Sequence, residues 1–230
     1  MDVLLVHGGS HDATCWKPLV HALTALGIST ATVDLPSAAG PGHPPAGVAE
    51  DARAIRARLV EHHPRMVLCH SYGGIPTTDA VLPSDGVELL IYLAAFMPAE
   101  GESVWTVPQA DRGEPTSESR VSEDGLYLEA TDPISMFYGT TPRRLAEQMV
   151  QTLRPQSMRS FSEPVGRAAW RDIPSAYLLT LQDKAIAPAQ QRLMAARATS
   201  VQEIDSDHSP HLGMPGDVAL RVRDLLSSLR

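Results

Sequence analysis

Short apolar runs recur along the chain and alternate with stretches in which apolar residues repeat at helical spacing. A short continuous apolar run is typical of a strand that is buried on both faces, as in a parallel sheet covered by helices. All of the runs except the last are predicted to be buried on both faces. The predicted strands are Val3–Val6, Thr30–Val33, Met66–Leu68, Leu89–Leu93, Ala176–Leu181 and Val201–Ile204.

Amphipathic helical patterns fill several of the intervals between these strands. In each pattern the apolar residues recur three or four positions apart, which places them on one face of a helix. Strands that alternate with helices indicate an α/β fold with a doubly wound, mostly parallel sheet, here of about six strands. The predicted apolar faces are Trp16, Leu19, Leu23 and Leu26; Val48, Ala52, Ile55 and Leu59; and Val218, Val222 and Leu225.

The alternation stops between about Pro98 and Ile173, where polar and charged residues and several prolines replace it. One helical pattern, from about Arg143 to Leu153, lies inside this stretch. Because the stretch falls between two predicted strands, we expect an insertion above the sheet rather than a linker. The sequence therefore predicts a single domain over residues 1–230, with a small helical cap inserted at about residues 98–173.

Composition narrows the range of partners. The chain has 230 residues and a formal net charge of −8, without a cluster of Lys and Arg, so neither nucleic acid nor a membrane surface is expected as a partner. A neutral or apolar small molecule fits better. With no signal-peptide pattern and no long apolar stretch, we predict a soluble, cytoplasmic protein. Cys15, Cys69 and the nine scattered histidines form neither a disulfide framework nor a metal-ligand pattern, so no metal or other cofactor is expected.

The third predicted strand ends in a serine flanked by small residues, in the sequence Cys69-His70-Ser71-Tyr72-Gly73-Gly74. A strand followed by Ser-x-Gly-Gly predicts a tight strand-to-helix turn that pushes Ser71 into a strained, exposed position, the nucleophile elbow. The usual pattern is Gly-x-Ser-x-Gly, and Cys69 replaces its first glycine. Because cysteine is small, we expect the elbow to tolerate it, and Ser71 is the candidate nucleophile.

Two further residues follow strands at the edge of the sheet where α/β proteins bind ligands. Asp183 comes after the fifth predicted strand and His208 after the sixth. With Ser71 they occur in the order Ser, Asp, His, one of the known chain orders of the hydrolytic triad. The imidazole takes the serine proton, and the carboxylate orients the imidazole and stabilises its cation. We therefore predict Ser71 as nucleophile, His208 as base and Asp183 as acid.

The oxyanion of such a reaction requires two backbone N–H donors that are already in place. Tyr72, directly after the serine, and Gly9, in the glycine-rich turn after the first strand, can offer them. Simpler roles remain open for some residues: His208 could cap the last helix and Asp183 could be a helix N-cap. His7 is interpreted as support for its turn, and His70 as structural or pocket-lining. The other candidates for the acid are Glu100, Asp205 and Asp207.

Four motifs together resemble those of the α/β-hydrolase superfamily, and within it the small branch of plant methyl esterases, plant hydroxynitrile lyases and bacterial esterase-like proteins. The resemblance extends over nearly the whole chain. It implies a helical cap above the pocket and the same roles for Ser71, His208, Asp183 and the amides of Gly9 and Tyr72. The motifs are Val6-His7-Gly8-Gly9, Cys69-His70-Ser71-Tyr72-Gly73-Gly74, Thr180-Leu181-Gln182-Asp183-Lys184-Ala185-Ile186 and Asp207-His208-Ser209-Pro210.

Four residues are candidates for substrate binding: His11, Trp105, Phe137 and His211. Large apolar residues in an otherwise polar cap suggest a pocket roof, although packing of the cap onto the sheet would also explain them. His211 stands where the resemblance leads us to expect an apolar residue. Further candidates for the roof are Met136 and Met149.

The leading prediction is a cofactor-independent serine hydrolase acting on a small carboxylic ester. A carbon–carbon lyase on the same scaffold would, by the resemblance, carry a lysine directly after the catalytic histidine and a threonine directly after the first-strand histidine. Ser209 and Gly8 occupy these positions, so a cation that would support cyanide release is missing there. A third alternative is a small-molecule receptor that has the same fold but no catalytic activity. The complete Ser-Asp-His set argues against this alternative.

Overall fold

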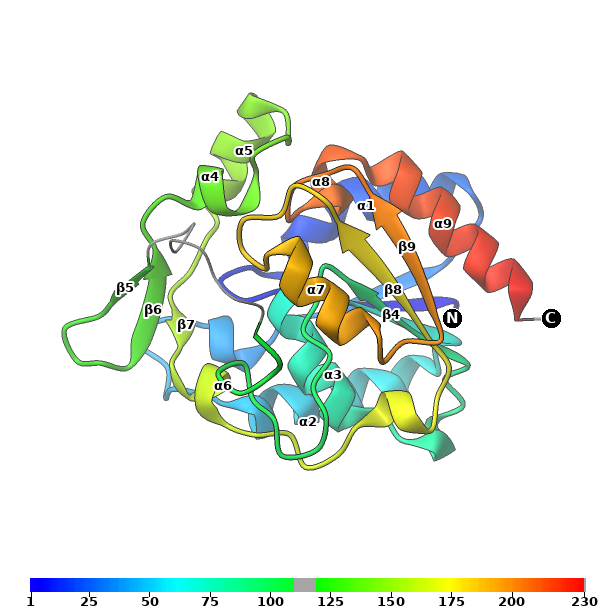
Figure 1. The fold of residues 1–230 in the computed structure, drawn as a ribbon, viewed down its shortest axis with the longest axis horizontal. Helices are drawn as coiled ribbons and strands as arrows, with labels where there is room; N and C mark the ends of the chain where they lie inside the picture. Colours follow the sequence, from blue (N-terminus) through cyan, green and yellow to red (C-terminus); the bar gives the residue numbers. More distant parts are fainter. Residues whose placement is uncertain (110–118, 230) are drawn as a thin grey trace.

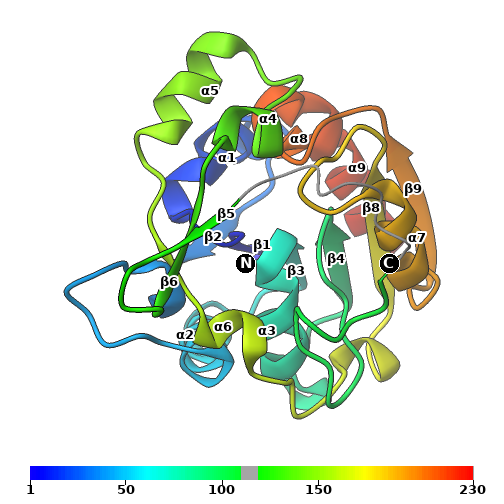
Figure 2. The same ribbon diagram turned by 60° about the vertical axis from the view of Figure 1, so that its left-hand side comes forward.

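A parallel sheet of six strands forms the centre of the computed structural model, which describes residues 1–109 and 119–229. The strand order β2-β1-β3-β4-β8-β9 places the first strand inside the sheet, with later strands added on both sides of it (Figure 2). The predicted doubly wound, parallel architecture is confirmed. The strands are β1 (Val3–Val6), β2 (Thr30–Val33), β3 (Met66–His70), β4 (Leu89–Leu93), β8 (Ser175–Thr180) and β9 (Ser200–Ile204).

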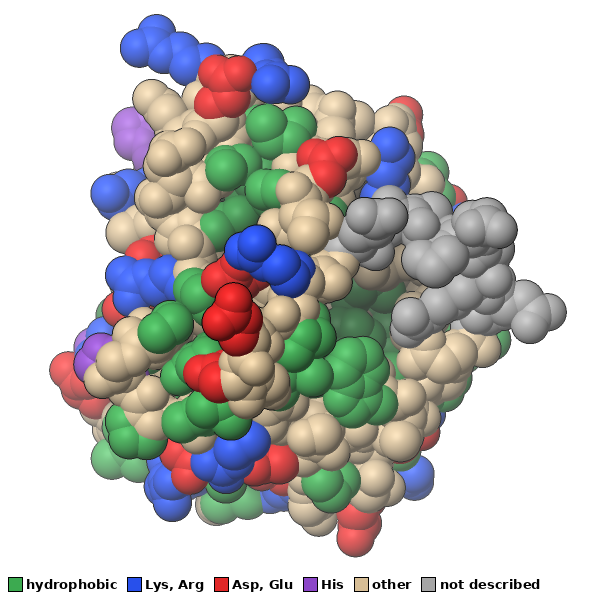
Figure 3. All heavy atoms as spheres, turned by 90° about the vertical axis from the view of Figure 1, so that its left-hand side faces the viewer, with side chains coloured by type: hydrophobic (Ala, Val, Ile, Leu, Met, Phe, Trp, Pro, Cys, Tyr) green, Lys and Arg blue, Asp and Glu red, His purple; other side chains and the backbone are tan. Residues whose placement is uncertain are grey.

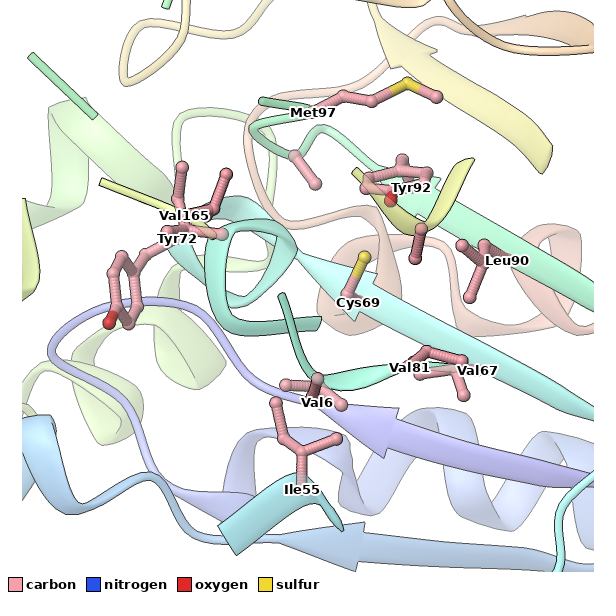
Figure 4. Close-up of a cluster of buried hydrophobic side chains, with 14 of the residues drawn as sticks. Val6, Ile55, Val67, Cys69, Tyr72, Val81, Leu90, Tyr92, Met97 and Val165 are labelled. Atoms are coloured by element: carbon pink, nitrogen blue, oxygen red, sulfur yellow. The ribbon is translucent and has the colours of Figure 1, made fainter. Parts of the chain in front are cut away.

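Alternate residues of the strands enter two separate hydrophobic cores, one on each face of the sheet. On β1, Leu4 and Val6 belong to the first core, whereas Val3 and Leu5 belong to the second. Figure 4 shows part of the first core, which α2, α3 and α7 cover; α1 and α9 cover the second. The flanking helices are α1 (Lys17–Ala25), α2 (Val48–His62), α3 (Gly74–Ala80), α7 (Pro188–Ala195), α8 (Pro210–Gly213) and α9 (Pro215–Ser228).

The strand β2 differs from its prediction. Thr30 and Thr32 are only partly buried, because β2 is an edge strand with one covered face, so the prediction that it is buried on both faces is wrong. Its alternation of threonines with Ala31 and Val33 is the period-two pattern of such a strand. The strand β3 extends through Cys69 and His70, and it therefore ends directly at the elbow.

The segment between β4 and β8 contains helices and also a second sheet, of three antiparallel strands in the order β5-β6-β7. The sequence predicted helices alone, and α5 confirms the expected helical pattern. The three strands were not predicted because they are short and contain polar residues, so they have no apolar run. Figure 2 shows α4, α6 and β6 arranged around β1, β3 and β4. The elements are β5 (Ser119–Val121), β6 (Tyr127–Ala130), α4 (Pro133–Phe137), α5 (Arg143–Val150), β7 (Gln156–Ser157) and α6 (Arg159–Ser162).

Among the helices of the described residues, none combines the length and the apolar character that crossing a bilayer requires. The cap here means the described residues between β4 and β8. Its elements β5, β6, β7, α4, α5 and α6 lie on the side of the molecule away from both termini (Figure 1). Parallel strands that begin near one side of the molecule end at the other, so the cap adjoins the carboxyl ends of the strands, where ligands bind in such sheets.

Candidate active site

Ser71 occupies a strained turn between β3 and α3. Its φ is +52°, in the left-handed region that residues other than glycine rarely adopt. A Cβ atom built on Gly73 would lie 2.4 Å from the His7 carbonyl oxygen, and one on Gly74 would lie 1.9 Å from the Phe96 carbonyl oxygen. Only glycine fits at either position, so the turn packs tightly between two loops and presents Ser71 at the end of its strand.

Cys69, which replaces the usual first glycine of the elbow, lies within β3 and is fully buried. Its thiol donates a hydrogen bond of 3.4 Å to the Ile91 carbonyl oxygen. Burial raises the pKa of this thiol, so Cys69 stays protonated and packs as part of the first core. The sheet therefore accommodates a cysteine in place of the first glycine of the elbow.

Asp183 and His208 form a buried pair. Nδ1 of His208 lies 2.7 Å from Oδ2 of Asp183, and both side chains are almost completely inaccessible to solvent. The amides of Ala185 and Ile186 each donate a hydrogen bond of 2.8 Å to the other carboxylate oxygen. Gln191 donates from Nε2 to Oδ2 at 2.9 Å. The carboxylate is thus fixed before any reaction, and it fixes the orientation of the imidazole.

The other three acidic candidates are engaged elsewhere or exposed. Asp207 accepts hydrogen bonds from the backbone amides of Thr140 and Thr141, and so anchors the cap to the loop after β9. Asp205 accepts from Gln182 at 2.7 Å, and Glu100 lies on the surface. Among the described residues, the carboxylate that contacts the His208 ring is that of Asp183.

The turn after β1 is held by two histidines. Nδ1 of His7 donates to the Gly8 carbonyl oxygen at 2.8 Å while its Nε2 accepts from the Leu35 amide at 2.9 Å. Nδ1 of His11 donates to the Gly9 carbonyl oxygen at 2.7 Å, and its Nε2 lies 2.7 Å from the Tyr138 hydroxyl. Burial lowers the pKa of His7, and it lowers that of His11 to about 4, so both rings are neutral and structural.

The same turn packs directly against the elbow. A Cβ atom built on Gly8 would lie 2.8 Å from Cβ of Ser71, so Gly8 cannot be replaced without movement. One built on Gly9 would lie 3.5 Å from Cβ of Tyr72, an ordinary contact. The backbone of Gly9 and that of Tyr72 therefore lie side by side next to Ser71. Because the N–H groups in the first turn of a helix have no intrahelical acceptor, the Tyr72 amide suits an oxyanion.

A pocket opens at Ser71. Figure 3 shows apolar side chains gathered in and around a hollow on this face of the molecule. Among its described lining residues no side chain is charged, and the polar ones are Ser10, Ser71, Tyr72 and Ser119. The apolar lining residues are Phe96, Leu128, Ala130, Met136, Phe137, Phe161, Ala185 and Ile186.

The four predicted substrate-binding residues are placed differently from one another. Phe137 lines the pocket. Trp105 does not; its ring is 50% exposed and lies 5.5 Å from that of Phe161. His11 is buried behind the turn after β1, and His211 is fully buried, so neither lines the pocket.

Of the predicted roof residues, Met136 lines the pocket, whereas Met149 packs into the second core. Phe96 and Phe161 also line the pocket, and neither was predicted from the sequence. Phe96 lies just beyond the carboxyl end of β4, which is a signal that could have identified it. Phe161 belongs to the short helix α6 of the cap, and no sequence pattern marked it. In the part of the chain that the structure describes, no three His, Cys, Asp or Glu side chains are placed to hold a metal ion.

Comparisons with known proteins agree with the fold. Residues 3–222 match the alpha/beta hydrolase family, and the chain belongs to that family. It is 30% identical over 234 residues to the probable hydrolase R7 of Phoma sp., covering 94% of this chain and 95% of that protein. It is 28% identical over 243 residues to the pFDCC methylesterase MES16 of Arabidopsis thaliana, covering 92% and 89%. A pyrethroid hydrolase from Sphingobium faniae shares the fold, with a TM-score of 0.84 at 24% identity over 99% of this chain and 98% of that chain.

Proposed function

We propose that this protein is a cofactor-independent serine hydrolase that cleaves a small, uncharged carboxylic ester through an acyl-enzyme. The observation that carries the proposal is the buried Asp183–His208 pair next to the elbow that presents Ser71 at an apolar pocket. The similar proteins include hydrolases and methylesterases, which supports ester hydrolysis as the reaction class.

The proposed reaction follows from the hydrogen bonds. Because Nδ1–H of His208 is directed at Asp183, the lone pair of the neutral ring is on Nε2, which takes the proton of Ser71 as Oγ attacks the ester carbonyl carbon. Asp183 stabilises the imidazolium that forms. The protonated ring then gives its proton to the departing alcohol, and water attacks the acyl-enzyme by the same route to release the acid and regenerate Ser71.

The tetrahedral intermediate carries its negative charge on the former carbonyl oxygen. We assign the N–H groups of Gly9 and Tyr72 as the donors to this oxyanion, because their backbones meet beside Ser71. The apolar lining around Phe137 and Phe161 fits uncharged acyl and alcohol groups. There is no room for a side chain at Gly8, because a threonine there would collide with Ser71. This supports a hydrolase over a lyase of this branch.

The test is a screen of p-nitrophenyl and methyl esters of aliphatic and aromatic acids, together with labelling by a fluorophosphonate probe. We expect turnover of at least one ester and covalent labelling, both of which disappear in Ser71→Ala. An unlabelled wild-type protein, ester turnover that persists in Ser71→Ala, or cyanide release from mandelonitrile without any ester turnover would contradict the proposal.

A further inference from the structure

A second buried carboxylate, outside the triad, lies close to the site. Asp51 is on α2 and its exposed fraction is 0%. Its Oδ2 accepts a hydrogen bond of 2.7 Å from the Tyr72 hydroxyl and one of 2.5 Å from the Ser37 hydroxyl, and its Oδ1 accepts one of 2.9 Å from the Ser37 amide. The Tyr72 side chain points away from Cys69 and Tyr92 in Figure 4, toward the edge of the first core.

The hydrogen bonds continue from Asp51 into the cap. The Ser37 hydroxyl, which donates to Asp51, accepts from Nε2 of Gln156 at 2.8 Å. Gln156 belongs to β7, and its Oε1 accepts from the Ser10 amide at 2.9 Å. Its Nε2 also donates to the Ser160 hydroxyl at 2.8 Å, so the amide orientation is determined at both ends.

The two branches of this network end on the two backbone segments that would form the oxyanion hole. One branch reaches Tyr72 directly, and the other reaches Ser10, the residue after Gly9. We infer that Asp51 is a positioning residue for the oxyanion hole, holding Tyr72 by its side chain and the Gly9–Ser10 turn through Ser37 and Gln156. The inference rests on the proposed function, since it assumes that these amides meet an oxyanion.

Stabilisation of an oxyanion depends on donors that are held at hydrogen-bond distance before the charge develops. A displacement of about 1 Å at a reacting centre can cost roughly 100-fold in rate. The Gly9 turn follows β1, whereas Tyr72 lies in the short helical turn after β3, so an anchor common to both would fix their separation. Asp51 provides one from the rigid helix α2.

The protonation state of Asp51 is sensitive to pH near neutrality. Burial, opposed in part by the hydrogen bonds from Ser37 and Tyr72, raises the pKa of Asp51 to about 6, and the neighbouring Glu50 acts in the same direction as burial. Since this pKa is raised above the value of 3.8 for an ordinary Asp, the folded protein binds more protons between about pH 4 and 6, and stability falls as the pH rises through that window. Tyr72, the other titratable group in contact, stays neutral because burial raises its pKa.

Protonation of Asp51 would disturb the network. The Ser37 amide, the Ser37 hydroxyl and the Tyr72 hydroxyl all donate to this carboxylate, so a proton on either oxygen competes with a donor that is already there. The positioning effect therefore depends on the charged form, and it should weaken as the pH falls through about 6.

The first measurement is the kinetics of Asp51→Asn on an ester found in the screen. At pH 8 we expect kcat to fall roughly 10- to 100-fold with KM changed less than about twofold, in a protein that circular dichroism shows to be folded. The ratio of wild-type to variant kcat should shrink toward one as the pH falls from 8 to 5, because wild-type Asp51 then becomes protonated. An equal kcat at pH 8, or a ratio independent of pH, would overturn the inference.

A matched pair of tyrosine variants provides the control. Tyr72→Phe removes the hydroxyl that donates to Asp51, and we expect a roughly tenfold lower kcat. Tyr92→Phe removes a hydroxyl buried in the same core, which lies 2.8 Å from the Thr78 hydroxyl, and should leave kcat unchanged. Equal losses in the two variants would indicate a general packing effect and would refute the specific role of Asp51.

A spectroscopic measurement separates this inference from the proposed function. In Asp51→Asn, the backbone amide resonances of Gly9 and Tyr72 should shift, whereas those of residues in β9 should not. Unchanged Gly9 and Tyr72 resonances refute the inference whether or not the protein hydrolyses esters. If the resonances shift in Asp51→Asn but the wild-type protein turns over no ester, Asp51 still anchors the two turns. That result would refute the proposed function and not the role of Asp51.

Discussion

His70, the residue before Ser71, donates a hydrogen bond of 2.8 Å from Nε2 to the backbone carbonyl oxygen of His208. Their ring centroids are 4.6 Å apart. The elbow that carries the proposed nucleophile is therefore bonded directly to the loop that carries the proposed base. Burial lowers the pKa of His70 well below its ordinary value, so the ring acts as a neutral donor.

Replacing His70 by leucine should therefore weaken both the fold and the site. The His208 carbonyl group would be left buried without its donor, at a cost of about 1–3 kcal/mol in the free energy of unfolding. We expect kcat to fall roughly tenfold because the loop of His208 relaxes. Urea unfolding and ester kinetics measure the two effects, and His70→Gln, which retains an N–H donor, should recover part of each.

Ser71→Ala and His208→Ala should each lower kcat by roughly 10⁴-fold or more, and the double variant should be no worse than the single ones, since triad residues act as a unit. Both residues lie at turns, so circular dichroism and thermal melts should show a folded protein. Additive losses in the double variant would show that the two residues do not act together.

Asp183→Asn should lower kcat by roughly 10⁴-fold without changing the order of preferred esters, because imidazole orientation is lost while the pocket is not altered. Asp205→Asn is the matched control, since Asp205 is exposed and bonded to Gln182. The comparison is made on kcat/KM over the same set of esters. A silent Asp183→Asn beside a damaging Asp205→Asn would mean that the acid has been misassigned.

Two neighbouring glycines should respond in opposite ways. Gly8→Ala should abolish ester turnover, because its Cβ would be 2.8 Å from Cβ of Ser71 and 2.9 Å from Nδ1 of His70. Gly9→Ala should keep most of the activity, because its Cβ meets its neighbours at 3.5 Å and its N–H is retained. Fluorophosphonate labelling rates provide the measurement. Comparable labelling of both variants would show that the turn after β1 moves easily relative to the elbow.

The buried histidines should make the protein sensitive to acid. Burial lowers the pKa of His7, His11, His70 and His211, so the unfolded chain binds more protons below its pKa of about 6.5 and stability falls as the pH decreases from there. Each contributes up to about 1.4 kcal/mol per pH unit, whereas Asp51 contributes in the opposite direction between about pH 4 and 6.

His211→Leu isolates one of these contributions. Both ring nitrogens of His211 are buried without a hydrogen-bond partner in the described structure, and the ring lies 4.7 Å from that of Trp16. We expect the variant to gain stability relative to the wild type at pH 5 and to gain less at pH 7, as measured by urea unfolding. An equal effect at the two pH values would show that His211 does not titrate on unfolding.

The strands and the pairing of Asp183 with His208 could be predicted because both depend on local patterns. Apolar runs define the strands, and β1, β2 and β4 have the predicted bounds. In a parallel sheet all carboxyl ends meet at one edge, so residues that follow two strands far apart in sequence come together there. The observed distance of 2.7 Å between Asp183 and His208 follows from that topology.

The cap and the buried histidines could not be predicted in the same way. The strands β5 and β6 have no apolar run, because β5 is exposed, β6 is mostly half-buried, and their pairing depends on contacts with one another. His11 was expected to bind substrate, yet its hydrogen bonds to Gly9 and Tyr138 face the protein interior. The sequence does not show whether a histidine side chain contacts solvent, substrate or a carbonyl group. The packing of the folded chain determines which of these it contacts.

The cap contributes to both hydrophobic cores, which limits how this protein can be re-engineered. Val107 and Val165 are buried in the first core, and Phe137 and Ala146 are buried in the second. Exchanging the whole cap for that of a relative would therefore open both faces of the sheet at once. New substrate ranges are better sought by changing Leu128 of β6, a pocket-lining side chain that belongs to neither core.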